Sequence, residues 1–95
     1  MRWIVYILRC ADETLYTGIT NDMPARLKKH EQGKGAKYTR GRGPLTLVYT
    51  ELYSGKGKAL AREAAIKRLN RAQKLELIKR GRKRRRGASG GRADP

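Results

Sequence analysis

The stretch that decides the fold is Trp3-Ile4-Val5-Tyr6-Ile7-Leu8, six consecutive apolar or aromatic residues near the N-terminus. Half of them are β-branched, and the run is too short for a good helix. A continuous apolar run of this length is typical of a central strand that is covered on both faces. We therefore expect residues 3–8 to form such a strand.

A second strand is expected at residues 14–19, after a short polar hairpin loop. If this loop closes between Cys10 and Thr14, Tyr6 lies opposite Gly18 in the antiparallel pair. The glycine has no side chain, so it leaves space for the tyrosine ring or for a ligand.

A third strand and three helices complete the expected fold. The strand covers residues 45–53, which are rich in Thr, Val and Tyr. The first helix is capped by Asn21 or Asp22 and stops at Gly33. The other two helices cover residues 57–70 and 71–80, and Gly81 ends the second of them. The sequence thus predicts an α+β fold, a small three-stranded, mainly antiparallel sheet flanked by helices, and it leaves the strand order open.

The chain is strongly basic, with 24 Lys and Arg against 8 acidic residues among 95, a net charge of +16. Residues 1–78 alone hold sixteen Lys and Arg against seven acids, so the folded part is basic in its own right. A polyanion is the default partner of such a chain. We expect one domain over residues 1–80 and a disordered basic tail over 81–95, which adds non-specific affinity for phosphates.

Several classes of protein are excluded by composition. A single cysteine and a single histidine, Cys10 and His30, exclude an intrachain disulfide and an ordinary structural zinc site. No apolar stretch approaches the ~20 residues of a membrane span, and no signal-peptide pattern is present. We expect a cytoplasmic, nucleoid-associated protein with no membrane partner. The sequence leaves the oligomeric state open, and a monomer is compatible with it.

Four polar side chains are expected close to one another. Tyr6 and Tyr16 come from the two N-terminal strands, while Arg26 and His30 are four residues apart and so share one helix face. Strand aromatics are usually core residues, and an Arg/His pair is often a solvated basic face. However, His30 is the only histidine, and its helix directly follows the Tyr16 strand. A tyrosine with a pKa near ~10 is a poor base at neutral pH unless neighbouring cations or a metal-bound network lower that value.

Glu63 stands in the apolar stripe of the helix expected at 57–70. Its neighbours Ala59, Leu60 and Ile66 fall within roughly 60° of it around the helix axis. A buried carboxylate is costly unless it is paired or bound to a metal. It either pairs with an arginine of the same fold or serves as a single protein ligand for Mg²⁺, whose other ligands are water and phosphate oxygens.

A glycine-rich basic segment at residues 33–44 is a candidate nucleic-acid interface. Its glycines let the backbone approach phosphates, and its one aromatic residue can stack on a base. A mobile, solvated loop is the alternative. The candidate contacts are Lys34, Lys37, Tyr38, Arg40 and Arg42.

In their order along the chain, these residues resemble the GIY-YIG nuclease superfamily, and in particular its small stand-alone bacterial members. The two signature tripeptides appear as Ile4-Val5-Tyr6, with Ile4 in place of the first glycine, and Tyr16-Thr17-Gly18. The resemblance covers about residues 2–78. Three later positions match the family's helix arginine, its frequent following histidine and its metal-binding glutamate: Arg26, His30 and Glu63.

The resemblance implies metal-dependent hydrolysis of a phosphodiester, with Tyr6, Tyr16, Arg26, His30 and Glu63 as catalytic residues. Glu63 would hold one Mg²⁺ or Mn²⁺ ion, and Arg26 would neutralise charge on the phosphoryl oxygens. One of the two tyrosines would orient or deprotonate the attacking water, with help from His30.

Two functions are therefore carried forward. The first is a structure-preferring or weakly specific DNA endonuclease, acting on duplex, branched or damaged DNA in repair or recombination. The alternative is a non-catalytic module that uses a nuclease fold to bind DNA or RNA. The costly position of Glu63 favours the enzyme.

Overall fold

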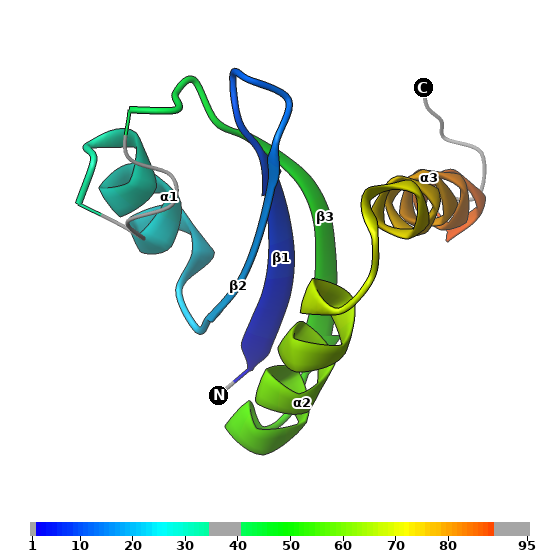
Figure 1. Ribbon diagram of the computed structural model, residues 1–95. Helices are drawn as coiled ribbons and strands as arrows, with labels where there is room; N and C mark the ends of the chain where they lie inside the picture. Colours follow the sequence, from blue (N-terminus) through cyan, green and yellow to red (C-terminus); the bar gives the residue numbers. More distant parts are fainter. Residues whose placement is uncertain (1, 35–40, 89–95) are drawn as a thin grey trace.

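The computed structural model describes the backbone of residues 2–34 and 41–88 and, within these ranges, the side chains up to Gly81. Three strands and three helices make up this part of the chain (Figure 1). In chain order they are β1 (Trp3–Arg9), β2 (Leu15–Thr20), α1 (Met23–Glu31), β3 (Thr46–Tyr53), α2 (Lys56–Lys67) and α3 (Arg71–Ala88). The predicted α+β class with a three-stranded sheet is confirmed.

The strands form one antiparallel sheet in the order β2-β1-β3, so β1 is the central strand. Residues 5–8 of β1 are fully buried, as the apolar run predicts. The Cys10 amide donates to the Thr14 carbonyl at 2.9 Å and closes the hairpin. Tyr6 is then paired with Gly18, which confirms the expected register.

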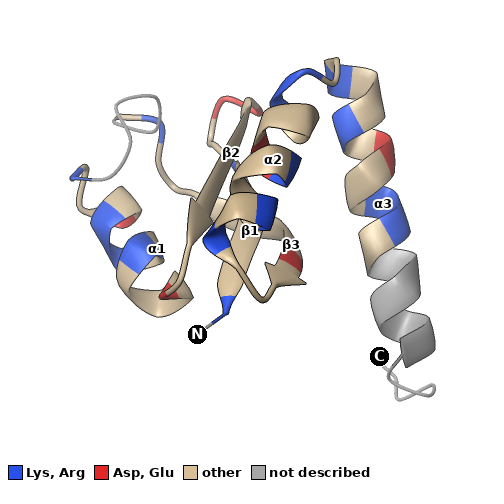
Figure 2. Ribbon diagram, turned by 90° about the horizontal axis from the view of Figure 1, so that it is seen from below, with Lys and Arg blue, Asp and Glu red and all other residues tan. Residues whose placement is uncertain are grey.

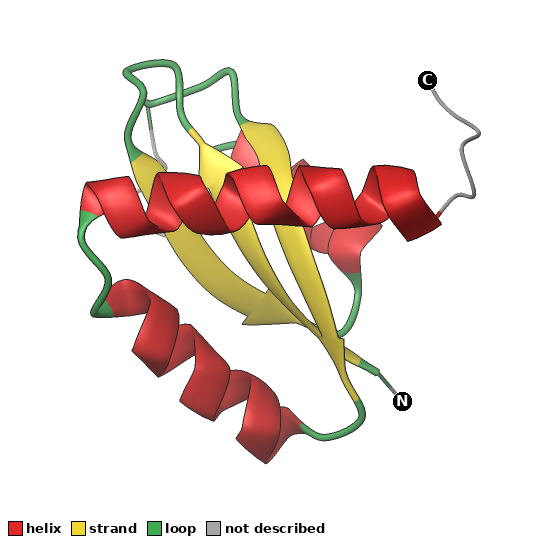
Figure 3. Cartoon of the chain, turned by 90° about the vertical axis from the view of Figure 1, so that its right-hand side faces the viewer, coloured by secondary structure: helices red, strands yellow, loops and turns green. Residues whose placement is uncertain are grey.

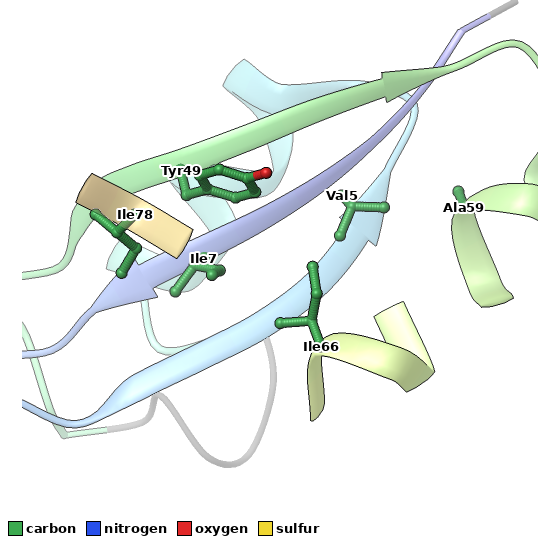
Figure 4. Close-up of a cluster of buried hydrophobic side chains, with 6 residues drawn as sticks. All are labelled: Val5, Ile7, Tyr49, Ala59, Ile66 and Ile78. Atoms are coloured by element: carbon green, nitrogen blue, oxygen red, sulfur yellow. The ribbon is translucent and has the colours of Figure 1, made fainter. Parts of the chain in front are cut away.

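Helices cover both faces of this sheet. Helix α1 lies on one side, while α2 and α3 lie on the other, with α3 crossing the strands (Figures 1 and 3). The main hydrophobic cluster fills the space between the sheet and the α2 and α3 helices (Figure 4). It consists of Val5, Ile7, Tyr49, Ala59, Ile66 and Ile78. Because strand side chains alternate, Tyr6 and Leu8 point instead to the α1 side.

Helix α1 is bounded by the signals expected from the sequence. The Asp22 side chain accepts a hydrogen bond from the Ala25 amide at 3.2 Å, and Gly33, with φ of 75°, follows the last turn. His30 is the one buried residue of this helix. The contact of α1 with the sheet therefore centres on the residue that was singled out for its chemistry.

The predicted end of the last helix at Gly81 is wrong, because α3 continues to Ala88. A Cβ atom at Gly81 would lie 2.8 Å from two ring carbons of Tyr49, so the glycine allows α3 to pack closely on β3. The described backbone is helical over residues 81–88, and residues 89–95 lie outside the described ranges. The division into a domain and a basic tail otherwise stays a prediction.

Charge is distributed unevenly over the described residues. Lys and Arg lie along all three helices, with single acidic positions among them, while acidic residues also occur on the β1–β2 hairpin and on β3 (Figure 2). Among the described helices, none is long and apolar enough to cross a bilayer.

Candidate functional site

Four of the predicted site residues meet on the α1 side of the sheet, and we call Tyr6, Tyr16, Arg26 and His30 the α1 cluster. The Tyr6 hydroxyl lies 2.9 Å from His30 Nε2. Arg26 Nε donates a hydrogen bond to the same hydroxyl at 3.3 Å. Tyr6 is thus the hub of the cluster, and it joins β1 to α1.

The ring of Tyr16 completes the packing around this hub. Its centroid lies 6.2 Å from that of Tyr6 and 5.4 Å from that of His30, and both pairs are tilted or edge-on. Gly18 is needed for this arrangement, because a Cβ atom there would lie 2.6 Å from the Tyr6 hydroxyl oxygen. The missing side chain in the second signature tripeptide therefore makes room for the tyrosine of the first.

Burial governs the protonation of the cluster. It raises the pKa of Tyr6 above 10, although the hydrogen bond from Arg26 acts in the opposite direction. Burial and the charge of Arg26 both lower the pKa of His30 below 6.5. At neutral pH Tyr6 is therefore protonated and His30 is neutral, and the Tyr6 hydroxyl and His30 Nε2 share a hydrogen bond between two uncharged groups. Of the cations expected to lower the pKa of a tyrosine here, Arg26 does so for Tyr6, but burial has the larger effect.

Glu63 lies on α2, and its side chain is 17% exposed. Its carboxylate pairs with Lys67 Nζ at 3.3 Å, one helical turn along. The partner of Glu63 in the structure is therefore a lysine, and not the arginine that the sequence analysis gave as one alternative. The negative charge of Glu63 contributes to the raised pKa of Tyr6, so it acts electrostatically on the α1 cluster.

A metal site at Glu63 would rest on one protein carboxylate. The side chains of residues 2–34 and 41–81 include no cluster of three or more His, Cys, Asp or Glu that could hold a metal ion. Mg²⁺ commonly takes one or two protein carboxylates and fills its remaining positions with water and phosphate oxygens. Glu63 fits a magnesium ion of this kind, and it does not fit a metal that needs several protein ligands.

The other face of the sheet carries a second polar cluster that sequence reasoning missed. The Glu51 carboxylate accepts hydrogen bonds from Tyr49 and from Tyr53, the latter at 2.6 Å. It also accepts from Arg62 Nε at 2.9 Å and from Nη2 at 3.0 Å. We call Tyr49, Glu51, Tyr53 and Arg62 the Glu51 cluster. The alternation Tyr49-x-Glu51-x-Tyr53, which puts all three side chains on one strand face, is the signal that could have found it.

Protonation in the Glu51 cluster is set by mutual contacts. Burial alone would raise the pKa of Glu51, but the hydrogen bonds from Arg62, Tyr49 and Tyr53 together hold it below its usual range. Burial and the bond to Glu51 raise the pKa of Tyr49 to about 12. At neutral pH the carboxylate is charged, the phenols are protonated, and the cluster joins β3 to α2.

The candidate nucleic-acid contacts are only partly described. Lys34 is exposed just after α1. Arg42 pairs with Asp12 at 2.6 Å, and its carbonyl accepts from the Ala11 amide at 2.8 Å, which ties this end of the loop to the β1–β2 hairpin. The other three predicted contacts, Lys37, Tyr38 and Arg40, lie outside the described residues.

A family model described as the GIY-YIG catalytic domain matches residues 2–76. The chain belongs to the GIY-YIG family. In this GIY-YIG domain the matched range includes β1, β2, α1, β3, α2 and the start of α3. It therefore spans both polar clusters.

Relatives of this GIY-YIG domain include small proteins of similar length. The UPF0213 protein CPE1444 of Clostridium perfringens is 60% identical over 74 residues, which cover 78% of this chain and 80% of that protein. The solution structure of the UPF0213 protein BH0048 from Bacillus halodurans is 49% identical, with a TM-score of 0.56. That of EF2693 from E. faecalis is 37% identical, with a TM-score of 0.60. Both alignments cover 83% of this chain and 84% of the other.

The family supports a nuclease-type function with a nucleic acid as substrate. The names of the UPF0213 relatives state no activity. The activity of this GIY-YIG domain must therefore be argued from its own site.

Proposed function

We propose that this protein is a metal-dependent endonuclease that hydrolyses phosphodiester bonds in DNA, with a preference for structure or only weak sequence specificity. Branched or damaged DNA, met in repair or recombination, is the substrate class we propose. One observation carries the proposal: the α1 cluster gathers a guanidinium and two phenols and includes no carboxylate. Such a group of donors is suited to an incoming anion.

Arg26 is the proposed phosphate ligand. Its side chain is only partly buried, and Nε is held by Tyr6, which fixes the orientation of the guanidinium. The described side chains include no acid within ion-pair distance of Arg26. Its charge is therefore available for the negative charge that develops on the phosphoryl oxygens during hydrolysis.

The two tyrosines have different proposed roles. Tyr6 is fully buried and protonated, so it positions Arg26 and His30 and does not act as a base at neutral pH. Tyr16 is only partly buried and lies against His30, so we assign to it the orientation of the attacking water. His30 is neutral and lies against Tyr16, so we assign to it the acceptance of a proton from that water.

Glu63 is the proposed metal ligand. When bound, Mg²⁺ or Mn²⁺ would supply Lewis-acid stabilisation of the scissile phosphate and the leaving oxygen. Glu63 itself contributes a carboxylate on α2, which would exchange its partner Lys67 for the metal ion.

Non-specific DNA affinity is proposed to come from basic residues outside the clusters. The loop residues Lys34, Lys37, Tyr38, Arg40 and Arg42 are retained as candidate contacts, and Arg42 has to divide its charge between Asp12 and a phosphate. The basic residues after Gly81 add contacts that neutralise phosphates without reading sequence.

A second candidate is a non-catalytic nucleic-acid-binding module. The observation that favours it is the ion pair between Glu63 and Lys67, because a bound ammonium group competes with a metal ion for the same oxygen.

The deciding experiment incubates labelled single-stranded, duplex and branched DNA with the protein, in Mg²⁺ or in a chelator. Glu63→Ala is compared with wild type and with Glu76→Ala, a matched control in which the lost carboxylate also pairs with a basic residue one turn along. We expect cleavage by wild type and Glu76→Ala in Mg²⁺ only, and a loss of about 10²–10³-fold in Glu63→Ala.

Two outcomes would speak against this assignment. Cleavage that survives both Glu63→Ala and the chelator would refute the metal mechanism. Equal binding of DNA by all three proteins, with no cleavage by any, would favour the binding module.

A further inference from the structure

A pocket beside the α1 cluster shares only Arg26 with the mechanism above. It is open, has a volume of about 280 Å³ and lies where β2 turns into α1. Trp3, Ile19, Thr20, Asn21, Asp22, Ala25, Arg26 and Lys29 line it. We propose that this pocket binds an unpaired nucleotide next to the scissile phosphate, an inference that rests on the proposed nuclease function.

The position of Arg26 connects the pocket to the site. The same guanidinium that donates to Tyr6 forms part of the pocket wall. A phosphate held by Arg26 therefore brings the neighbouring nucleotide of the strand to the mouth of the pocket.

The charge of the pocket suits a second phosphate. Lys29 is exposed and lies three residues after Arg26, so the two cations share one face of α1. The acid in the lining, Asp22, uses one carboxylate oxygen to cap α1 through the Ala25 amide. The pocket lining therefore carries two cations, Arg26 and Lys29, and one acid, Asp22, whose carboxylate caps α1.

The other wall of the pocket is apolar and aromatic. Trp3 packs against the main hydrophobic cluster and has Lys56 Nζ 5.2 Å from the centroid of its ring, so a nucleotide in the pocket would meet the part of this side chain that the packing leaves exposed. Ile19 adds an aliphatic side chain beside it. An aromatic ring next to phosphate-binding cations is an arrangement with which proteins hold single-stranded nucleic acid, because the bases stack on the ring.

The pocket therefore defines a substrate class. In a paired duplex each base is stacked between its neighbours and hydrogen-bonded to its partner, so it cannot leave the helix without an energetic cost. A nucleotide in a single strand, a flap or a branch point has no such restraint. We infer that this protein prefers DNA with an unpaired nucleotide beside the cleaved bond.

The fluorescence of Trp3 tests this inference directly, since it is the only tryptophan of the chain. The full-length protein is titrated, in chelator so that nothing is cleaved, with a short thymidine oligonucleotide and with a blunt duplex of the same length. We expect saturable quenching by the single strand, with at least about tenfold weaker binding of the duplex.

Lys29→Ala and Lys28→Ala form the matched pair of variants. Both lysines are exposed on α1, but only Lys29 lines the pocket. We expect Lys29→Ala to weaken single-strand binding about five- to tenfold and Lys28→Ala to change it less than twofold. Thermal unfolding of both variants checks that they are folded.

Three outcomes would overturn the inference. The first is saturated binding, followed by fluorescence anisotropy of a labelled oligonucleotide, with no change at Trp3. The second is an equal loss in the two lysine variants, which would indicate general charge attraction. The third is the same quenching by inorganic phosphate alone, which would indicate an anion site. Because no metal is present, these results do not depend on whether the protein cleaves DNA.

Discussion

The two faces of the sheet carry two polar clusters built from nearly the same residues. The α1 cluster has two tyrosines, one arginine and His30, while the Glu51 cluster has two tyrosines, one arginine and Glu51. The difference is therefore one residue, an imidazole in place of a carboxylate.

That residue decides what each cluster does. In the Glu51 cluster two phenols and a bidentate guanidinium donate to one carboxylate, so positive and negative charge meet within the cluster. In the α1 cluster the guanidinium of Arg26 has no anion among the described side chains, and its neighbour His30 is neutral. We infer that the Glu51 cluster stabilises the fold and that the α1 cluster binds a phosphate of the substrate through Arg26.

The largest effect on stability is expected from Glu51→Ala. The substitution leaves Arg62 and the Tyr49 hydroxyl partly buried without their acceptor, so we expect a loss of about 3 kcal/mol in the free energy of unfolding. Chemical denaturation measures this change. Glu76→Ala removes a carboxylate that is 57% exposed and should stay within about 0.5 kcal/mol of wild type. Equal effects of the two substitutions would contradict a stabilising role for the Glu51 cluster.

A pair of glycine substitutions separates the clusters with a smaller perturbation. Gly18→Ala places a methyl group against the Tyr6 hydroxyl, and Gly81→Ala places one against the Tyr49 ring. Overpacking of this kind costs about 1–3 kcal/mol, and in Gly81→Ala a gain of helix propensity of about 1 kcal/mol offsets part of it.

The two glycine variants should differ in activity. We expect Gly18→Ala to lower the cleavage rate of the folded protein, because Tyr6 must move away from Arg26 and His30. Gly81→Ala should leave that rate near the wild-type value. Thermal unfolding and single-turnover cleavage, measured on both variants, would contradict the comparison if Gly81→Ala lost more activity than Gly18→Ala.

The smallest effect concerns His30 and pH. Tyr6, Tyr16 and Arg26 surround this imidazole, and burial together with Arg26 lowers its pKa below 6.5. On acidification the unfolded chain binds a proton at His30 before the folded chain does, so stability falls as the pH drops below about 6.5. Denaturation between pH 5 and 7 should show this slope in wild type and a flatter one in His30→Gln. An unchanged slope would mean that other groups cause it.

Much of the fold was predictable from short-range patterns. The apolar run at residues 3–8, the Tyr6–Gly18 register and the Asp22 cap follow from neighbours within one hairpin or one helical turn. The order β2-β1-β3 depends on how helices pack on the two faces, which no local pattern carries. Gly81 was interpreted as the end of a helix, but it allows α3 to pack on the Tyr49 ring. Tyr49 is distant in sequence, so no local pattern indicates this contact.

The candidate site was predictable to a similar extent. The α1 cluster was expected because its four residues lie within one β-hairpin and the following helix. The position of Glu63 on the inner side of α2 was expected too, but its pairing with Lys67 was not. Glu51 was missed because an acid in an edge strand is usually a solvent-facing residue. Its partner Arg62 lies on a different element, α2, and comes close to it only when α2 packs on the sheet.

The measurement that tests the central claim most directly compares the two arginines. Single-turnover cleavage of a branched DNA in Mg²⁺, at saturating protein, is measured for Arg26→Ala and Arg62→Ala, with the folded fraction determined by denaturation. We predict that Arg26→Ala lowers the rate by about 10²–10³-fold without loss of stability, and that Arg62→Ala lowers stability but keeps the rate of the folded protein within about threefold. A rate that falls as much in Arg62→Ala as in Arg26→Ala, or that is unchanged in Arg26→Ala, would contradict the assignment of catalysis to the α1 cluster.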